Sequence, residues 1–124
     1  MIMDTLQKQK ILIFTAGKDA SNLEKTLTDY DIKVVNSIEN ARSVLKEENY
    51  KFLLIYGFGE HTEFFAKEIS KLYKYIRICE ISARAGSEED INKAHESGIS
   101  RIYQESSIDT GSLKFAIDEY FKSQ

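Results

Sequence analysis

The sequence has no proline and only one cysteine, Cys79, among its 124 residues. A lone cysteine excludes an intramolecular disulfide and a cysteine metal cluster. Its place in the apolar run IRICEI predicts a buried, unreactive thiol. No stretch approaches the ~18 consecutive apolar residues of a membrane span, and the first ten residues lack the apolar run of a signal peptide. These absences favour a cytoplasmic protein with no membrane partner.

An excess of one charge is also missing. Seventeen Lys and Arg residues face twenty Asp and Glu residues, so the net charge is only −3. This balance argues against a nucleic-acid partner, because such a surface needs a basic excess. The composition, 42% hydrophobic and 30% charged, is typical of a globular domain. With no repeat or linker-like stretch, we expect one domain over residues 9–124, preceded by a flexible leader at residues 1–8.

What the chain does have is a regular alternation of strand-like and helix-like segments. The strand-like runs are 11–14, 32–35, 52–56, 76–81 and 101–103. Apolar residues at helical spacing follow each run, around Leu23, Leu45, Phe65, Ala94 and Ile117. Alternation of this kind favours parallel strands with right-handed crossovers. Strands that are apolar on both faces predict helices on both sides. We therefore expect an α/β fold, a three-layer flavodoxin-like (βα)5 domain with strand order 2-1-3-4-5.

Capping signals mark the predicted helix ends. Ser21 precedes Glu24 by three residues, and Ser87 precedes Asp90 by three, which is the spacing of a capping box. Gly98 follows the fourth helical segment, where a left-handed residue ends many helices.

The third strand-like run and its continuation, KFLLIYGFGE, place a tyrosine at a position of interest. Four apolar residues lead into Tyr56, and a Gly-x-Gly turn follows at Gly57 and Gly59. In α/β proteins, ligands and chemistry gather at the carboxyl ends of central strands. A carboxylate there would indicate acid chemistry, whereas Tyr56 supplies only a weakly acidic phenol.

Four phrases carry a resemblance to a known family. They are KILIF at Lys10–Phe14, FLLIY at Phe52–Tyr56, ISA at Ile81–Ala83 and AHESGISRIY at Ala94–Tyr103. With the element order, they make residues 10–121 similar to the receiver domain of two-component response regulators. The last phrase is the most specific, because alanine, three residues, glycine and a short fifth strand follow the family's pattern.

The resemblance implies five site positions, of which only one keeps the family's chemistry. The Mg²⁺-binding acids fall on Thr15 and Ala16, and the phospho-acceptor aspartate falls on Tyr56. The hydroxyl that senses phosphate falls on Ser82, and the lysine after the fifth strand falls on Glu105 or a neighbour within QESS. In the family a proline follows that lysine with a cis peptide, and this chain has no proline.

These changes point to a degenerate, pseudo-receiver form without a phospho-acceptor. A phenol of pKa ~10 does not replace a carboxylate nucleophile at pH 7. Thr15 and Ala16 bring no charge to Mg²⁺, and Glu105 repels phosphate. We expect no cofactor, no catalysis and phosphorylation-independent signalling. The Tyr56 ring is expected to fill the vacated pocket, with its hydroxyl bonded to Ser82 or Thr15.

A docking face is expected on the fourth helix, fifth strand and last helix, which receivers commonly use for partners or dimers. Its candidate residues are Lys93, Arg101, Tyr103, Lys114 and Glu119. Tyr103 occupies the position of the family's switch aromatic, and without phosphate it is expected to keep one rotamer. The expected partners are other signalling proteins or a second copy of the chain. The chain is also compatible with being one domain of a longer regulator.

The main alternative is a small-ligand or nucleotide sensor that uses the cleft at the strand ends. Its lining would be Thr15, Gly17, Lys18, Tyr56, Gly57 and Ser82. The stretch FTAGKDAS lacks the glycine spacing of a phosphate loop, so a turn capped by Asp19 or Ser21 is favoured there.

Weaker alternatives concern the two histidines and Tyr56. His61 with Glu60 and Glu63 imitates a metal site, but a solvated loop is favoured, and His95 is expected next to the apolar face of its helix, at the boundary of that face. No acid–base pair or activated nucleophile supports an enzyme. Phosphorylation of Tyr56 by a kinase is disfavoured by its enclosed position at the end of a strand.

Overall fold

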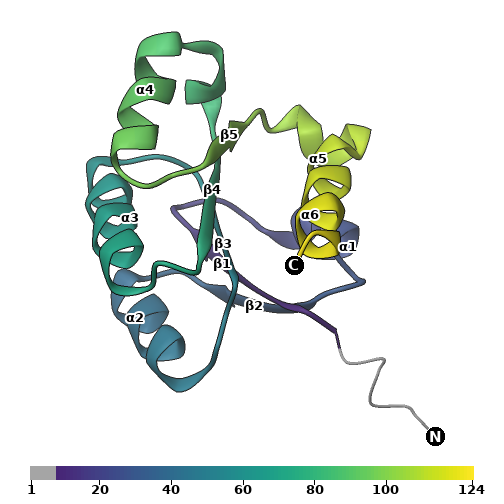
Figure 1. Ribbon diagram of the computed structural model, residues 1–124. Helices are drawn as coiled ribbons and strands as arrows, with labels where there is room; N and C mark the ends of the chain where they lie inside the picture. The colour runs from purple at the N-terminus through teal and green to yellow at the C-terminus, as the bar shows by residue number, and fades with distance from the viewer. Residues whose placement is uncertain (1–7) are drawn as a thin grey trace, which may run out of the picture.

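The computed structural model describes residues 8–124, and five parallel strands form its centre (Figure 1). The strands are β1 (Lys10–Thr15), β2 (Asp31–Val35), β3 (Phe52–Tyr56), β4 (Arg77–Ile81) and β5 (Arg101–Tyr103). Their order is β2-β1-β3-β4-β5, and every neighbouring pair is parallel. The predicted three-layer fold and strand order are therefore confirmed.

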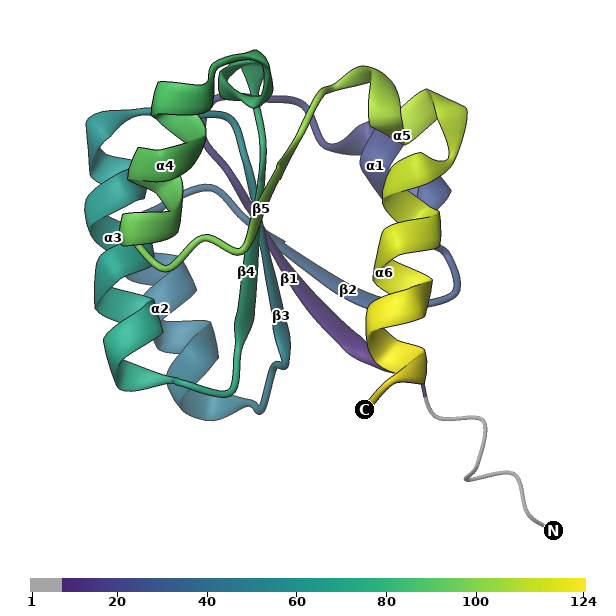
Figure 2. The ribbon, with the colours of Figure 1, turned by 45° about the horizontal axis from the view of Figure 1, so that its top comes forward.

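Helices cover both faces of the sheet. They are α1 (Ser21–Thr26), α2 (Ile38–Glu47), α3 (Glu60–Leu72), α4 (Glu88–Glu96), α5 (Ser106–Thr110) and α6 (Ser112–Lys122), with a 3-10 turn η2 (Ala83–Gly86) before α4. Figure 2 shows α2, α3 and α4 on one side and α1, α5 and α6 on the other. None of the helices within residues 8–124 is both long enough and apolar enough to cross a membrane.

Each face of the sheet has its own apolar core because side chains alternate along a strand. On one side, Leu53 and Ile55 of β3 pack with residues of α2, α3 and α4. On the other side, Leu54 and Tyr56 pack with residues of α1, α5 and α6. Cys79 is buried in this second core, as predicted, and burial raises the pKa of its thiol to about 12. The thiol is thus protonated and unreactive at neutral pH.

Three local expectations are confirmed and two are wrong. The Ser87 side chain accepts a hydrogen bond from the Asp90 amide, and Gly98 ends the α4 region with φ of +91°. The expectation of a turn capped by Asp19 is supported, because its carboxylate accepts hydrogen bonds from both the amide and the hydroxyl of Ser21. A capping box based on Ser21 is therefore wrong. His95 is exposed on α4, so its expected place at the boundary of the apolar face is also wrong.

The helix after β5 is divided in two, which the sequence pattern did not predict. Gly111 has φ of +84°, a left-handed conformation that ends α5 and precedes α6. The short α5 brings Ile108 into the core, and the predicted fifth helix corresponds to α6. The predicted flexible leader at residues 1–8 falls almost wholly on residues 1–7, which lie outside the described residues.

Candidate signalling site at the carboxyl ends of the strands

The five positions implied by the resemblance lie at one edge of the sheet. The strands end in register, with Thr15 opposite Tyr56 and Tyr56 opposite Ile81. Backbone hydrogen bonds continue past the strands, from the Ala16 amide to the Tyr56 carbonyl (2.8 Å) and from the Ser82 amide to the Tyr103 carbonyl (3.0 Å). The backbone of this edge is thus fixed from β1 to β5.

Tyr56 is bonded to Glu105 across this edge. The phenol, whose side chain is almost fully buried, donates to Glu105 Oε2 at 2.5 Å. Burial, the bond to Glu105 and nearby carboxylates together raise the pKa of Tyr56 to about 12. The phenol is therefore a neutral hydrogen-bond donor at pH 7 and cannot act as a nucleophile.

Lys18 completes a small charged group with Tyr56 and Glu105. Its Nζ lies 3.6 Å from Glu105 Oε1 and 6.0 Å from the centre of the Tyr56 ring. The Tyr56 hydroxyl, and then the charge of Lys18, lower the pKa of Glu105. The resemblance implies acids after the first strand and a lysine after the fifth. Here the lysine follows β1 and the acid follows β5, so the charges are exchanged.

The hydrogen bond expected from Tyr56 to Ser82 or Thr15 is wrong. Tyr56 lies on the face of the sheet that α1, α5 and α6 cover. The Ser82 hydroxyl instead donates to Glu80 Oε2 at 2.6 Å, and the Thr15 hydroxyl makes a long bond of 3.4 Å to the Val35 carbonyl. Neither hydroxyl is turned toward the Tyr56 phenol.

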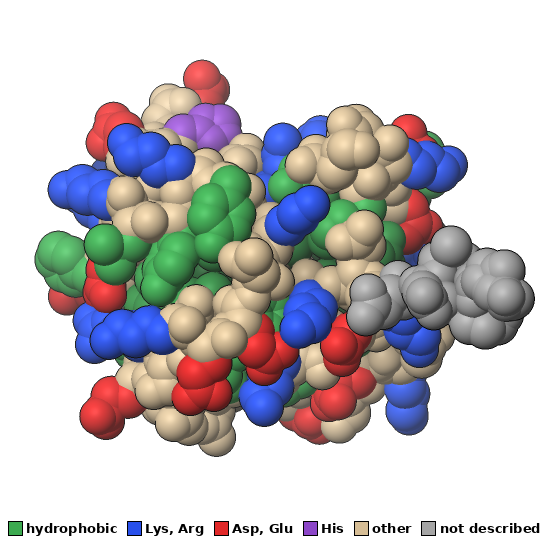
Figure 3. All heavy atoms as spheres, turned by 60° about the horizontal axis from the view of Figure 1, so that its bottom comes forward, with side chains coloured by type: hydrophobic (Ala, Val, Ile, Leu, Met, Phe, Trp, Pro, Cys, Tyr) green, Lys and Arg blue, Asp and Glu red, His purple; other side chains and the backbone are tan. Residues whose placement is uncertain are grey.

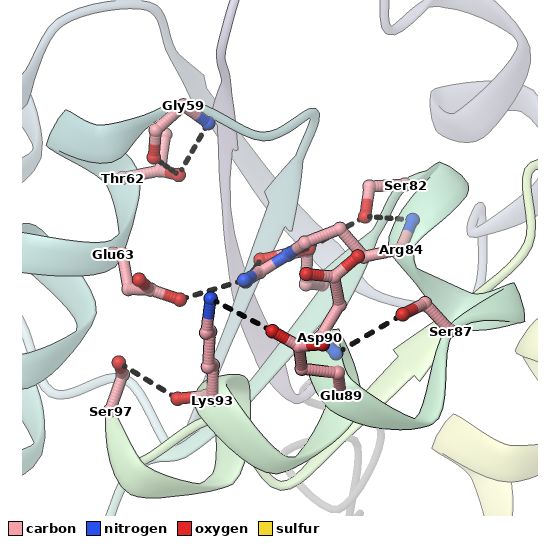
Figure 4. Close-up of polar contacts among 11 residues, drawn as sticks. Gly59, Thr62, Glu63, Ser82, Arg84, Ser87, Glu89, Asp90, Lys93 and Ser97 are labelled. Carbon is pink, nitrogen blue, oxygen red and sulfur yellow. Dashed lines mark hydrogen bonds and ion pairs between the residues drawn. The ribbon is translucent and has the colours of Figure 1, made fainter.

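Ser82 belongs to a buried ionic network, shown in Figure 4, that sequence reasoning missed. Glu80 of β4 is fully buried and receives two hydrogen bonds from Arg84, at 2.9 and 2.8 Å. Arg84 is 7% exposed and also donates to Glu63 of α3 at 2.7 Å. The Arg84 amide donates to the Ser82 hydroxyl at 3.2 Å, and the Phe58 ring covers the guanidinium at 3.8 Å.

The two buried charges of this network, Glu80 and Arg84, are hydrogen-bonded to each other, as burial requires. Burial opposes the charge of Arg84, but its hydrogen bonds to Glu80 and Glu63 outweigh burial and raise the pKa of the guanidinium. The signal in the sequence was an acid in the middle of an apolar strand, Glu80 in IRICEI, with an arginine four residues later. The network joins the β4–α4 segment to α3.

The predicted docking residues are only partly brought together. Arg101, Tyr103 and Glu119 border a groove of about 780 Å³ between β5 and α6, together with the exposed Phe115. Tyr103 is half-buried, and the Arg101 guanidinium lies 5.8 Å from its ring centre.

Two of the predicted docking residues lie apart from this groove. Lys93 is on α4 and pairs with Glu89 at 3.5 Å. Lys114 points to another side of α6, because it pairs with Asp118 at 2.8 Å and with Asp29, which precedes β2, at 3.0 Å.

The residues expected to line a ligand cleft do not form one cavity. Thr15 and Lys18 border a groove of about 460 Å³ beside β2 and α2, but Tyr56 and Ser82 do not. Gly57, with φ of +113°, presses the β3–α3 turn against the β1–α1 loop, since a Cβ there would lie 3.0 Å from the Ala16 carbonyl oxygen. Gly17 is exposed with φ of +82°. Within residues 8–124, no three His, Cys, Asp or Glu side chains gather as a metal site.

Comparison with known proteins identifies the fold. No protein-family model matches the sequence, and no curated protein is recognisably similar to it. The fold is similar to the signal receiver domain of an HD domain-containing protein from Pseudomonas fluorescens, with a TM-score of 0.77 and 13% identity over 94% of this chain and 97% of that chain. It is also similar to an orphan response regulator of H. pylori, with a TM-score of 0.72 and 14% identity over 90% and 97% of the two chains.

A third similar structure is an atypical orphan response regulator described as having a phosphorylation-independent regulatory mechanism. Its TM-score is 0.63, with 17% identity over 74% of this chain and 78% of that chain. Identities this low establish the fold and leave the chemistry to the residues of this chain. The structural neighbours are receiver domains of response regulators, orphan and atypical ones among them, and this chain has their flavodoxin-like fold.

Proposed function

We propose that this chain is a phosphorylation-independent, receiver-like signalling domain that acts by binding other signalling proteins. The observation that carries the proposal is the bond from the Tyr56 phenol to Glu105 at the acceptor position. A neutral phenol replaces the nucleophile, and a carboxylate stands where a cation would pair with phosphate. The same edge offers Mg²⁺ no acid at Thr15 or Ala16.

The state of Ser82 supports the same proposal. In a receiver, the hydroxyl at this position swings toward phosphate, and the switch aromatic follows it inward. Here the hydroxyl is bonded to the buried Glu80, and the next turn of chain is tied to it through Arg84. If Ser82 swung away, the buried Glu80 carboxylate would lose the hydrogen bond from its hydroxyl, and such a loss is costly in the core. We therefore propose that Tyr103 keeps a single rotamer and that the docking face has one constant shape.

The proposed docking face is the groove between β5 and α6. It combines the exposed Phe115 with Arg101 and Glu119, so it offers an apolar contact between charges of opposite sign. Such a face suits a protein partner or a second copy of the chain. The atypical orphan regulator with a phosphorylation-independent mechanism gives a precedent on the same fold. No enzymatic activity is proposed.

A titration of the ¹⁵N-labelled domain with Mg²⁺ and beryllofluoride, which imitates a phosphorylated aspartate, tests the proposal. We expect no saturable shifts at Tyr56, Ser82 or Glu105. A receiver with a working site, titrated in parallel, shows that the reagent is active. Saturable shifts around these residues would mean that another acid rebuilds the phosphate site, and the proposal would then be wrong.

The second candidate function is a sensor of a small anionic ligand. It is favoured by the groove beside β2, where Lys18 and Lys33 face Asn36 and Asn40 with no acidic lining residue. A thermal-shift screen of nucleotides, flavins and cyclic dinucleotides separates the two candidates. A ligand raises the melting temperature of a sensor by several degrees, whereas a docking module shows no shift with any of these compounds.

A further inference from the structure

Two arginines line the groove between β5 and α6, which is the docking face of the proposed function. Arg77 is the first residue of β4, and Arg101 is the first residue of β5. Arg101 is the register partner of Cys79, which lies two residues after Arg77 and packs in the core under α6. Alternate residues of a strand share a face, so both arginines lie on the side of the sheet that α6 covers. Figure 3 shows the end of the molecule where the strands begin, with Lys and Arg side chains exposed beside hydrophobic ones.

Both positive charges act on the same part of the groove. Burial raises the pKa of the Cys79 thiol to about 12, and the charges of Arg77 and Arg101 oppose this rise. Burial also raises the pKa of the Tyr103 phenol, and the same two arginines oppose that rise. The two guanidiniums therefore lie near the same two side chains and form one positive site.

No acid of the described residues compensates these two cations. Neither Arg77 nor Arg101 makes an ion pair within residues 8–124. Among the described residues that line the groove, Glu119 is the one acid, and its carboxylate pairs with Lys122 at 3.4 Å. The lining of the groove therefore carries a net positive charge, in a chain whose net charge is −3.

Aromatic rings hold both guanidiniums at the wall of the groove. The Arg77 guanidinium lies 4.7 Å from the centre of the Tyr120 ring, and the Arg101 guanidinium lies 5.8 Å from the centre of the Tyr103 ring. Such contacts orient a guanidinium and leave its N–H groups available to a carboxylate. Phe115, which is 66% exposed, adds an uncovered apolar surface to the same groove. The groove thus offers two oriented cations beside an apolar contact.

We propose that the partner at this docking face presents an acidic segment, whose carboxylates bind Arg77 and Arg101 and whose apolar side chain packs on Phe115. The proposal rests on the proposed function, since it names the chemistry of the partner at the same groove. An arginine binds a carboxylate through two parallel hydrogen bonds, so two arginines select acidic side chains. The apolar contact supplies much of the affinity, while the charges steer association and reject basic segments.

An acidic protein segment fits this groove better than a nucleic acid does. A single-stranded nucleic acid needs open aromatic faces for its bases and a track of cations along its backbone. Here two cations line the groove instead of a track, and their guanidiniums lie over the Tyr103 and Tyr120 rings. The net negative charge of the chain also opposes binding to a polyanion.

Selection from a random library of short displayed peptides, with the whole protein as bait, tests the proposal without assuming a partner. Enriched peptides are expected to be acidic with at least one large apolar residue, and to shift the ¹⁵N resonances of Arg77, Arg101 and Phe115. Arg77→Gln/Arg101→Gln should weaken their binding at least about tenfold, whereas Arg77→Lys/Arg101→Lys keeps the charge and should retain more of it. Lys67→Gln/Lys71→Gln removes the same charge from α3, on the other side of the sheet, and this matched control should bind as the parent does.

The outcomes separate this proposal from the proposed function. Neutral or basic peptides at the groove, or acidic peptides that bind all variants equally, would overturn the acidic partner and leave the docking face in place. Peptides that shift only residues elsewhere, or a selection that enriches no peptide, would overturn the acidic partner and the docking face together. The beryllofluoride titration tests independence from phosphorylation separately.

Two further outcomes would assign the groove to another occupant and overturn the proposal. A dimer of the parent that is lost in Arg77→Gln/Arg101→Gln would assign it to a second copy of the chain. Binding of oligothymidine that is lost in the same variant would assign it to nucleic acid. Circular dichroism confirms that each variant is folded, and the single variant Arg101→Gln carries the same test if the double variant is not.

Discussion

Two charged groups lie at the carboxyl ends of the strands, and they differ in burial and in the length of their ion pairs. The first group, which we call the loop group, joins Tyr56 at the end of β3 to Glu105 and Lys18 in loops, and the two charged side chains are 59% and 46% exposed. The group of Glu80, Arg84 and Glu63 is built on β4, η2 and α3, and its central pair is 0% and 7% exposed. One ion pair measures 3.6 Å, while the other pairs measure 2.7 and 2.8 Å.

The difference in burial assigns the two groups different roles. An exposed ion pair contributes little to stability because water and salt screen it. A buried pair is costly to break, because the partner that remains is an uncompensated charge. The loop group therefore lies at the position that the resemblance assigns to the phospho-acceptor and does not stabilise the fold strongly. The buried group fixes the β4–α4 segment, the part that moves in a switching receiver.

Arg84→Gln is expected to have the largest effect. It leaves Glu80 buried without its cation, so the free energy of unfolding should fall by about 3 to 5 kcal/mol. Urea unfolding followed by circular dichroism measures the loss. Amide hydrogen exchange should also rise over residues 82–88, because the turn after β4 loses its anchor.

Arg42→Gln is the matched control for Arg84→Gln. Arg42 donates two hydrogen bonds to Glu68 of α3, at 2.8 and 2.7 Å, as Arg84 does to Glu80. The Arg42 pair, however, lies at the surface. Its loss should leave the urea midpoint almost unchanged. If the two variants lost equal stability, the difference between a buried and an exposed pair would not hold in this protein.

Tyr56→Phe is expected to have an intermediate effect. It removes one hydrogen bond and keeps the ring, so the free energy of unfolding at pH 7 should fall by about 0.5 to 1.5 kcal/mol.

The pH dependence of stability tests the Tyr56 hydroxyl itself. The pKa of Tyr56 is raised in the folded state to about 12, so the folded protein holds the proton more tightly than the unfolded chain. The stability from this group is complete below pH ~10 and is lost as the pH rises toward 12.

The measurement is urea unfolding of the parent and of Tyr56→Phe at several pH values between 7 and 11. Above pH 10 the parent should lose stability more steeply than the variant, since the variant has no phenol at this position. Tyr50 also has its pKa raised to about 12, by burial, so Tyr50→Phe is the control that keeps the Tyr56 bond. Equal slopes for the parent and Tyr56→Phe would contradict the assignment.

The sequence alone predicted the backbone of this edge well. The apolar runs predicted the last residues of β3 and β5 correctly. Tyr56, Ser82 and Glu105 therefore lie at the edge of the sheet where they were expected. The partner of Tyr56 was predicted wrongly for a physical reason. Alternate residues of a strand face opposite sides, so Tyr56 shares a face with Leu54, whereas Ser82 turns with Glu80 toward α3.

The buried network was not predicted because its contacts join distant segments. Glu80 and Arg84 are four residues apart, but the first lies in strand β4 and the second in a 3-10 turn, so helical spacing rules do not apply to them. Glu63 enters from α3, seventeen residues before Glu80, and sequence spacing gives no measure of that approach. An isolated acid in an apolar strand was the one visible signal, since such a charge needs a partner.

Lys18→Met is expected to have the smallest effect, and it separates charge from hydrogen bonding at the loop group. The ammonium lies 3.6 Å from Glu105 and is almost half exposed, so its removal should leave stability nearly unchanged. The Tyr56 bond should persist, because the phenol donates to the other carboxylate oxygen. In ¹⁵N spectra at pH 7, shifts should stay near Lys18 and Glu105. Shifts that spread to Ser82 or Tyr103 would mean that the loop group and the buried network act as one unit, and the comparison between them would fail.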